Sequence, residues 1–302
     1  SWKKENIFII TLNYALIMGG NRIRIGLVQA EADENIGANL EKTAKYIHEA
    51  SKKGAHIVCL QELFAIRYPA QKEDKSAFFL AEKIPGKTAD FLATQAKENN
   101  VTLVGGSLFE KDDDGKYYNT SLTFSSSGEI IAKYRKVHIP YDPFYYEQFY
   151  FSRGNLGFVQ VKANNAVISP LICYDQWYPE AARINALKGS QVIFYPTAIG
   201  WSEEMKEKEP WTMKRWQDAM RSHASLNGIY VAAVNRVGKE DNLEFWGNSF
   251  IVGPFGEIVA QASGSKEEVL LAEIDLSMVK SSQEGWMFLK NRQPKNYSEL
   301  VK

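Results

Sequence analysis

The sequence lacks both a disulfide framework and a surplus of charge of either sign. Only two of its 302 residues are cysteines, too few for a disulfide-stapled fold, so the simplest interpretation is a reduced, cytoplasmic chain. Lys and Arg together number 36, as do Asp and Glu, which leaves a formal net charge of zero. Proteins that neutralise phosphates usually carry a basic surplus, so the composition argues against a nucleic-acid partner.

Long hydrophobic runs are also missing. Residues 7–18 are mostly apolar, but Thr11 and Asn13 interrupt them, and no segment approaches the run of about eighteen apolar residues that a spanning helix needs. Gly19-Gly20-Asn21-Arg22 is a poor signal-peptide cleavage site. We therefore expect no membrane partner, and we interpret residues 1–22 as an N-terminal extension, native or vector-derived, with Met18 as a candidate natural start.

The rest of the chain has the pattern of one globular domain, residues 23–302. Strand-like and helix-like segments are mixed without a Pro/Gly/Ser-rich linker or a repeat, which predicts an α/β domain (α+β in type) with mixed sheets covered by helices. One helix is expected to begin at an Asn39 cap, and others cover residues 89–99, 179–187 and 211–226. The expected strands are residues 23–30, 55–60, 101–109, 118–124, 129–133, 158–161, 166–172, 192–195, 229–234, 249–252, 258–260 and 269–274.

Three chemically useful side chains follow apolar strands, where open α/β sheets place their ligands: Glu62, Lys136 and Cys173. A cysteine at a sharp turn between a strand and a loop is expected to be exposed and close to a helix start, which favours a reactive thiolate. The alternative is that Cys173 is a small buried hydrophobic residue, as Cys59 within its own strand is expected to be.

A thiol nucleophile needs a base. His138 or His223 would make a papain-like pair, although nothing in the spacing supports one, and no two His or Cys residues have the spacing of metal ligands. The other candidate base is Glu62, because burial can raise the pKa of a carboxyl until it exchanges protons near neutral pH. Lys136 would then donate to the oxyanion of a tetrahedral intermediate; the alternative is a solvated charge in the basic cluster at residues 133–136.

Taken together, the segments around these residues resemble the signature regions of the nitrilase (carbon–nitrogen hydrolase) superfamily. They are residues 60–64 (LQELF), 134–140 (YRKVHIP) and 171–180 (LICYDQWYPE), and residues 146–151 (YEQFYF) are similar to the second-glutamate region. The resemblance covers about residues 23–297. It implies a four-layer αββα sandwich for the carbon–nitrogen hydrolase domain, no metal or organic cofactor, and a homodimer or higher homo-oligomer.

The resemblance also implies a catalytic set of Glu62, Lys136, Glu147 and Cys173. Glu62 would accept the thiol proton of Cys173, which then attacks the substrate carbon. Lys136 and the backbone N–H of Tyr174 would hold the oxyanion. Glu147 would orient Lys136 and the substrate or help to place the attacking water.

Within the superfamily, the resemblance is greatest to enzymes that hydrolyse N-carbamoylputrescine to putrescine, CO2 and ammonia in polyamine biosynthesis. Gln176 stands where relatives that bind carboxylated carbamoyl amino acids tend to carry Arg, so it argues against a carboxylate on the substrate. The supporting stretches are residues 138–140, 147–151, 175–177, 195–200 and 233–238, whereas residues 68–71 and 141–145 depart from the expected pattern.

A carbamoyl amine substrate needs an apolar channel and a partner for its ammonium group. Aromatic side chains would line the channel. Asp142 is the first candidate to bind the ammonium group. Glu203 and Glu204 are the next candidates; the alternative for these two is that they lie in a solvated charged loop and bind no substrate. The predicted substrate-binding residues are Asp142, Tyr145, Tyr174, Trp177, Thr197, Ala198 and Trp201.

Other functions remain open at this point. The rival enzymes are a β-ureidopropionase-like, an ω-amidase-like and a short-chain aliphatic amidase. A catalytically silent scaffold is disfavoured, because it has no reason to keep four interacting polar groups. A nucleotide-binding module is excluded by the absence of a GxGxxG or GxxxxGK[ST] motif after a strand.

Overall fold

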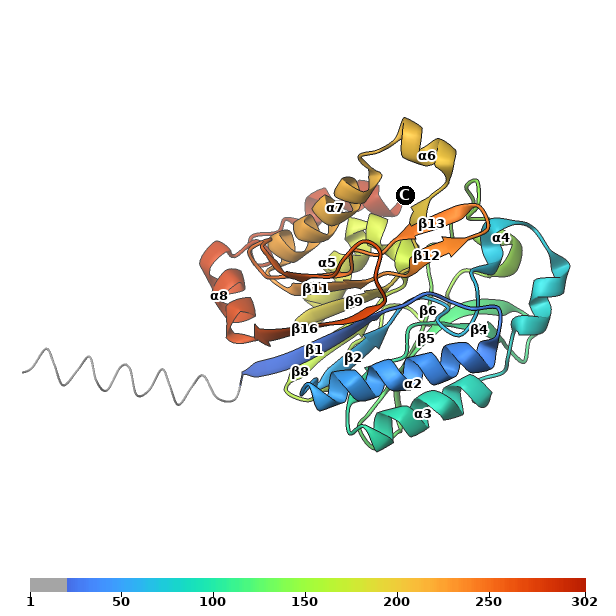
Figure 1. Ribbon diagram of the computed structural model, residues 1–302. Helices are drawn as coiled ribbons and strands as arrows, with labels where there is room; N and C mark the ends of the chain where they lie inside the picture. The colour runs from blue at the N-terminus through green and yellow to red at the C-terminus, as the bar shows by residue number, and fades with distance from the viewer. Residues whose placement is uncertain (1–20) are drawn as a thin grey trace, which may run out of the picture.

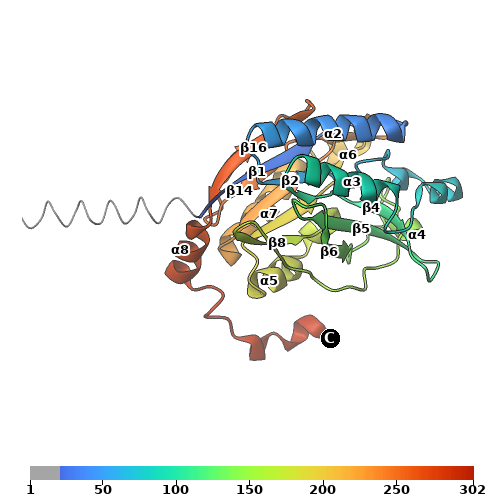
Figure 2. The same cartoon turned by 90° about the horizontal axis from the view of Figure 1, so that it is seen from below.

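The computed structural model describes residues 21–302, so the extension predicted for residues 1–22 lies almost wholly outside the described residues. Two β-sheets pack face to face between two layers of helices (Figure 1), and Figure 2 shows α2 and α5 on opposite sides of the sheets. The predicted four-layer α/β sandwich is therefore confirmed. No helix within residues 21–302 is both long and apolar enough to cross a bilayer.

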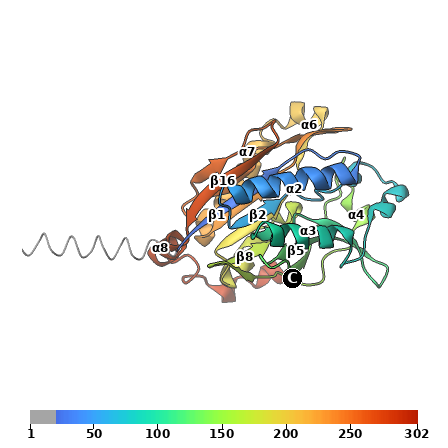
Figure 3. The ribbon, with the colours of Figure 1, turned by 60° about the horizontal axis from the view of Figure 1, so that its bottom comes forward.

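The first sheet has seven strands in the order β16-β1-β2-β3-β5-β4, with β6 paired to β5. Its outer face is covered by α2 (Ile36–Lys52) and α3 (Lys87–Glu98), which lie side by side in Figure 3. Their apolar faces bury Ile47 and Leu92 against sheet residues such as Leu60 and Leu122. The strands are β1 (Arg22–Gln29), β2 (Ile57–Leu60), β3 (Thr102–Val104), β4 (Leu108–Lys111), β5 (Tyr117–Phe124), β6 (Ile130–Arg135) and β16 (Glu268–Asp275).

The second sheet has six strands in the order β15-β14-β11-β9-β8-β7, and β9 and β11 contact β2 and β1 of the first sheet. Helices α5 (Pro179–Leu187) and α7 (Thr212–Asn227) cover its other face through Ala182, Trp216 and Met220. The strands are β7 (Val161–Ala163), β8 (Ala166–Pro170), β9 (Val192–Pro196), β11 (Tyr230–Val234), β14 (Phe250–Val252) and β15 (Ile258–Gln261).

Smaller elements connect and border the sheets. A three-stranded sheet is formed by β10 (Gly200–Trp201), β13 (Leu243–Trp246) and β12 (Val237–Glu240), none of which the sequence pattern predicted. The short helices are α4 (Glu147–Tyr150), α6 (Glu203–Lys208) and α8 (Ser277–Trp286), and the 3-10 helices are η1 (Pro69–Gln71), η2 (Lys75–Leu80), η3 (Cys173–Trp177), η4 (Pro294–Asn296) and η5 (Ser298–Val301).

Three local predictions are wrong. The strand predicted at residues 158–161 shares only Val161 with β7, which covers Val161–Ala163. The strand predicted at residues 101–109 is two strands, because Gly106 has a φ of +61° and a Cβ there would lie 2.2 Å from the Gln61 carbonyl oxygen. Asn39 does not cap α2; Asn35 does, accepting from the Ala38 N–H at 3.1 Å, while the buried Asn39 amide donates to the Ala65 carbonyl at 3.0 Å.

The strands bring the predicted catalytic residues to one end of the sandwich. Glu62 follows β2 and Lys136 follows β6 in the first sheet, whereas Cys173 follows β8 in the second. The three residues therefore lie between the two sheets, beyond the carboxyl ends of the strands that precede them.

Candidate active site

Lys136 joins the two predicted catalytic glutamates. Its Nζ lies 2.8 Å from Glu62 Oε1 and 2.8 and 2.7 Å from the two carboxylate oxygens of Glu147. All three side chains are completely buried. The alternative prediction, that Lys136 is a solvated charge, is therefore wrong. The other two cations of the basic cluster, Lys133 and Arg135, form ion pairs with Glu110.

Cys173 is held at a strained turn beside this trio. Its φ is +40°, in the left-handed region that costs a non-glycine residue about 1–2 kcal/mol, so the surrounding structure must hold it there. The expectation of an exposed thiol is wrong: Cys173 is only 6% exposed, and it belongs to an apolar core cluster that includes residues of both sheets and Ile199. The Ala198 backbone N–H hydrogen-bonds to the sulfur.

Burial and charge keep this thiol protonated at rest. Burial, followed by the Glu62 carboxylate, raises the pKa of Cys173 well above its ordinary value, although Lys136 acts in the opposite direction. Burial also raises the pKa of Glu147 to about 7, with Glu62 adding to the effect and Lys136 opposing it. Burial would lower the pKa of Lys136, but the Glu147 and Glu62 carboxylates outweigh it and raise that pKa, so Lys136 remains an ammonium.

The two carboxylate oxygens of Glu62 differ in their hydrogen bonding. Glu62 Oε1 accepts from Lys136 and from Asn119 Nδ2, the latter at 2.8 Å. Glu62 Oε2 is buried and has no hydrogen-bond partner among residues 21–302. A buried charged oxygen without a donor is costly, and such atoms mark strained or chemically used positions. Glu62 therefore has one anchored oxygen and one that is available for a proton.

Several residues that hydrogen-bond to the two glutamates were not predicted from the sequence. Tyr68 donates its hydroxyl to Glu147 Oε1 at 2.7 Å, and Arg236 donates to the carbonyls of Glu62 and Leu63 at 3.0 and 2.9 Å. Asn119 holds Glu62 from the middle of β5. A polar residue within a strand gives no sequence signal of this role, whereas Tyr68 and Arg236 lie in stretches already singled out for their similarity to, or departure from, the family pattern.

The histidines are not placed as a base for the thiol. His138 Nδ1 lies 2.7 Å from Asp175 Oδ1, and its ring stacks on Tyr178 with centroids 3.7 Å apart. His223 Nε2 lies 2.8 Å from the Gln176 carbonyl oxygen, and burial lowers its pKa. Within the described part of the chain, no cluster of three or more His, Cys, Asp or Glu side chains is placed to hold a metal ion.

Three of the predicted substrate-binding residues interact with Cys173 or Glu62. Tyr145 shares an electrostatic interaction with Cys173, and its hydroxyl bonds both the N–H and the carbonyl of Gly200 at 2.9 and 3.1 Å. Ala198 contributes its N–H to the sulfur. The Thr197 carbonyl accepts from the Glu62 N–H at 3.4 Å, while its hydroxyl turns back to the Tyr195 carbonyl.

A surface pocket of about 500 Å³ is bordered by Tyr174, the residue after Cys173; we call it the outer pocket. Cys173 itself does not line it. The lining residues are Val137, His138, Ile139, Tyr141, Asp142, Gln148, Arg153, Tyr174 and Tyr178. Burial and then Tyr178 raise the pKa of Tyr174 to about 12; Asp142 adds to this, and Lys136 opposes it. Asp142 and Arg153 are exposed and form no ion pair with any residue of the described chain.

The remaining predicted contacts lie elsewhere around the site. Trp177 lies beneath the guanidinium of Arg215 on α7, and Trp201 packs against Trp246 with centroids 4.6 Å apart. Neither lines the outer pocket. The next ammonium candidates are paired on the surface, Glu203 with Lys239 at 3.5 Å and Glu204 with Lys208 at 2.5 Å.

Gln176 gives weaker evidence on the substrate than its sequence position indicated. It is completely buried, and its side-chain oxygen accepts from Trp216 Nε1 at 2.7 Å. Packing against α7 thus accounts for the amide oxygen, whereas the buried Nε2 has no hydrogen-bond partner among the described residues. A carboxylate on the substrate has a different candidate partner, the unpaired Arg153 of the outer pocket.

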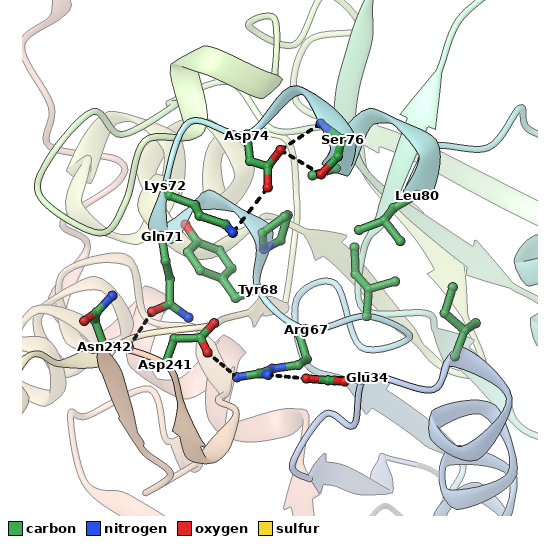
Figure 4. Close-up of a pocket in the computed structure, with 14 residues that line it drawn as sticks. Glu34, Arg67, Tyr68, Gln71, Lys72, Asp74, Ser76, Leu80, Asp241 and Asn242 are labelled. Atoms are coloured by element: carbon green, nitrogen blue, oxygen red, sulfur yellow. Dashed lines mark hydrogen bonds and ion pairs between the residues drawn. The ribbon is translucent and has the colours of Figure 1, made fainter.

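A second cavity, of about 530 Å³, is lined by Tyr68 and is shown in Figure 4. Its charged side chains pair with one another: Arg67 with Glu34 and Asp241 at 3.1 Å each, and Lys72 with Asp74 at 3.2 Å. Cys173 does not line it. This cavity therefore offers no unpaired charge to a substrate.

Replacing Tyr68 by phenylalanine tests the ionisation of Glu147. The Tyr68 hydroxyl donates to the ionised carboxylate and lowers the pKa of Glu147, so the Tyr68→Phe variant should have a higher Glu147 pKa. If catalysis needs ionised Glu147, the acid limb of kcat/KM will move to higher pH by up to about one unit. The measurement is the pH profile of both proteins, and an acid limb that stays in place would contradict that role for Glu147.

The fold and these side chains define a class before any comparison: an αββα sandwich that encloses a thiol, a lysine and two carboxylates is the arrangement implied for hydrolases of the nitrilase superfamily. The family model for carbon–nitrogen hydrolases matches residues 24–284. The chain belongs to the carbon–nitrogen hydrolase family, as predicted, and is a hydrolase acting on carbon–nitrogen bonds.

Individual relatives cover almost the whole chain. It is 38% identical to N-carbamoylputrescine amidase from Arabidopsis thaliana over 92% of this chain and 94% of that protein. It is 34% identical to a citrullinase from Francisella tularensis over 93% and 98%. Among solved structures, a carbon–nitrogen hydrolase from Helicobacter pylori G27 is similar, with a TM-score of 0.89, 39% identity and coverage of 93% and 99%.

Proposed function

We propose that the protein hydrolyses N-carbamoylputrescine to putrescine, CO2 and ammonia through an intermediate on Cys173. The observation that carries this proposal is the asymmetry of Glu62, whose Oε1 is fixed by Lys136 and Asn119 while the buried Oε2 has no donor. A carboxylate held in this way is suited to accept a proton from the neighbouring thiol and return it later. The similarity to N-carbamoylputrescine amidases supports the substrate.

In the first half-reaction Glu62 takes the thiol proton as the Cys173 sulfur forms a bond to the carbamoyl carbon. The carbonyl electron pair moves to oxygen, where the charge of Lys136 and the Tyr174 N–H, in the first turn of η3, stabilise it. Because Glu147 holds Lys136 through both of its oxygens, one N–H can turn to the oxyanion while the other bond remains. Collapse expels one nitrogen, which receives the proton from Glu62.

In the second half-reaction water attacks the carbon bound to Cys173, and Glu62 takes the proton of that water. The carbon–sulfur bond breaks, and the thiol recovers a proton from Glu62. The released carbamate decomposes to CO2 and the second nitrogen product, so that one water and one substrate yield putrescine, ammonia and CO2.

The experiment that tests the proposed substrate is a comparison of three ureido compounds with purified protein. N-Carbamoylputrescine should release putrescine and ammonia with a kcat/KM at least about tenfold above those of N-carbamoyl-β-alanine and citrulline. Putrescine is measured by chromatography and ammonia by a coupled assay. A preference for N-carbamoyl-β-alanine would overturn the proposed substrate and leave the hydrolase class intact.

Asp142 is the expected partner of the distal ammonium group. Because Asp142 lines the outer pocket and is unpaired, Asp142→Lys should raise KM for N-carbamoylputrescine by about tenfold or more. N-Butylurea is the matched neutral substrate, since it has the same carbon chain without the ammonium group, and its KM should change less than about twofold. Equal changes for both substrates would exclude Asp142 from ammonium recognition.

Citrulline is a second candidate substrate, favoured by one observation. Arg153 is an unpaired cation that lines the outer pocket, as does Asp142. Arg153 could bind the carboxylate of an α-amino acid and Asp142 its ammonium group. The similarity to a citrullinase supports this candidate. It predicts that Arg153→Gln raises KM for citrulline but lowers or leaves unchanged KM for N-carbamoylputrescine, because only citrulline has a carboxylate.

A further inference from the structure

Asp175 is a completely buried carboxylate for which the proposed chemistry has no direct use. It accepts four hydrogen bonds, from groups on two segments of the chain. Oδ2 accepts from the turn that carries Cys173 and from Tyr134 before Lys136, and Oδ1 accepts from His138 after Lys136.

The Oδ2 side closes a ring around the strained cysteine. The Ile172 N–H donates to Asp175 Oδ2 at 3.0 Å, and the Asp175 N–H donates to the Ile172 carbonyl at 3.0 Å. Cys173, with its positive φ, lies inside this ring. Tyr134 of β6, two residues before Lys136, donates its hydroxyl to the same oxygen at 2.7 Å.

The Oδ1 side holds the other end of the Lys136 segment. The backbone N–H of His138 donates to Asp175 Oδ1 at 3.0 Å, and the His138 ring nitrogen Nδ1 lies 2.7 Å from it. Lys136 is thus flanked on both sides by residues bonded to Asp175. The His138 side chain is 23% exposed at the wall of the outer pocket, whereas Asp175 is inaccessible.

We propose that Asp175 is a positioning residue that fixes the Cys173 turn against the segment carrying Lys136, and that the His138 ring completes it by donating to Oδ1. Asp175 touches neither the sulfur nor the ammonium, so it acts through geometry: losing a donor lets the thiol and the lysine shift relative to each other. Misplacement by about 1 Å can lower a rate about 100-fold. The inference rests on the proposed nucleophilic role of Cys173.

Two substitutions of His138 separate hydrogen bonding from packing. His138→Asn places an amide N–H where the ring Nδ1 now lies, whereas His138→Ala has no donor, and both remove the ring that stacks on Tyr178. We expect His138→Asn to keep kcat within about threefold of the unsubstituted protein and His138→Ala to lose about tenfold or more. Equal losses in both variants, or none in either, would overturn the proposal.

Asp175→Asn tests the carboxylate itself. In either orientation of the amide, its NH2 group replaces one of the two carboxylate oxygens and faces the N–H or O–H donors that this oxygen accepted from. The lost hydrogen bonds should lower kcat about 100-fold and change KM less than about threefold. The matched control is Glu110→Gln, which alters another buried carboxylate, bonded to Arg135 and Lys133 but not to the Cys173 turn. Similar kcat losses in Asp175→Asn and Glu110→Gln at similar Tm would contradict a positioning role. If Asp175→Asn does not fold, the comparison of kcat between His138→Asn and His138→Ala tests the proposal instead.

The rate of alkylation by 2-chloroacetamide gives a readout that needs no substrate. Mass spectrometry of the Cys173 peptide should show slower modification in Asp175→Asn and His138→Ala than in Glu110→Gln and His138→Asn. If the protein hydrolyses none of the ureido compounds, the proposed substrate fails while this ranking still tests Asp175. Unchanged alkylation rates in all four variants would contradict the positioning role.

Discussion

Cys173→Ala should lower kcat for N-carbamoylputrescine by at least about four orders of magnitude and leave the fold intact. Removing a nucleophile eliminates the covalent route altogether, and the residual rate comes only from binding and charge stabilisation. Alanine keeps the Cβ and therefore the same backbone strain at this position, and the substitution creates only a small cavity, so the Tm should change little. The measurements are steady-state kinetics and thermal unfolding of the variant.

Cys59→Ala is the matched control for this experiment. Cys59 is also completely buried, but it lies within β2 and burial alone raises its pKa. Its replacement should leave kcat within about twofold of the unsubstituted protein. A Cys173→Ala variant that hydrolyses the substrate as fast as Cys59→Ala would end the proposed mechanism.

Glu62→Gln should reduce kcat about 1,000-fold with little change in KM. The amide can still face Lys136, but it cannot take the thiol proton, and the raised pKa of Cys173 keeps that thiol neutral. For the same reason the variant should regain activity as the pH rises, because hydroxide then ionises the thiol without the base. The measurement is the pH dependence of kcat in both proteins.

The control for Glu62→Gln must also neutralise a buried carboxylate near Lys136. Glu110→Gln does so on β4, where Glu110 pairs with Lys133 and with Arg135, the residue before Lys136. It should retain kcat within about threefold. If Glu62→Gln kept kcat within about tenfold at neutral pH, Glu62 would not be the base.

The sheet and helix pattern was largely readable from the sequence because buried strands and amphipathic helices leave periodic signals. Helix α5 was predicted with its observed ends, since Pro179 can start a helix and Gly189 follows its end. The β12–β13 hairpin was missed because its strands are short and mix charged with apolar residues. The break between β3 and β4 was missed because it depends on the approach of Gly106 to Gln61, which is a tertiary contact.

The same limit applies to the site. The position of Glu62, Lys136 and Cys173 after apolar strands indicated that they meet, but their burial could not be read from local pattern. The burial of Cys173 depends on an apolar cluster that brings together residues from both sheets, distant in the sequence. Asn119 and Asp175 support the site through side-chain hydrogen bonds between segments that sequence alone does not place together.

The most direct test is to stop the reaction with acid during turnover and to examine the Cys173 peptide by mass spectrometry. With N-carbamoylputrescine the peptide should carry either a carbamoyl group or its aminobutyl-substituted form, depending on which nitrogen leaves first, and Glu62→Gln should form this adduct more slowly. Steady turnover with an unmodified Cys173, or with the adduct on another residue, would contradict the account.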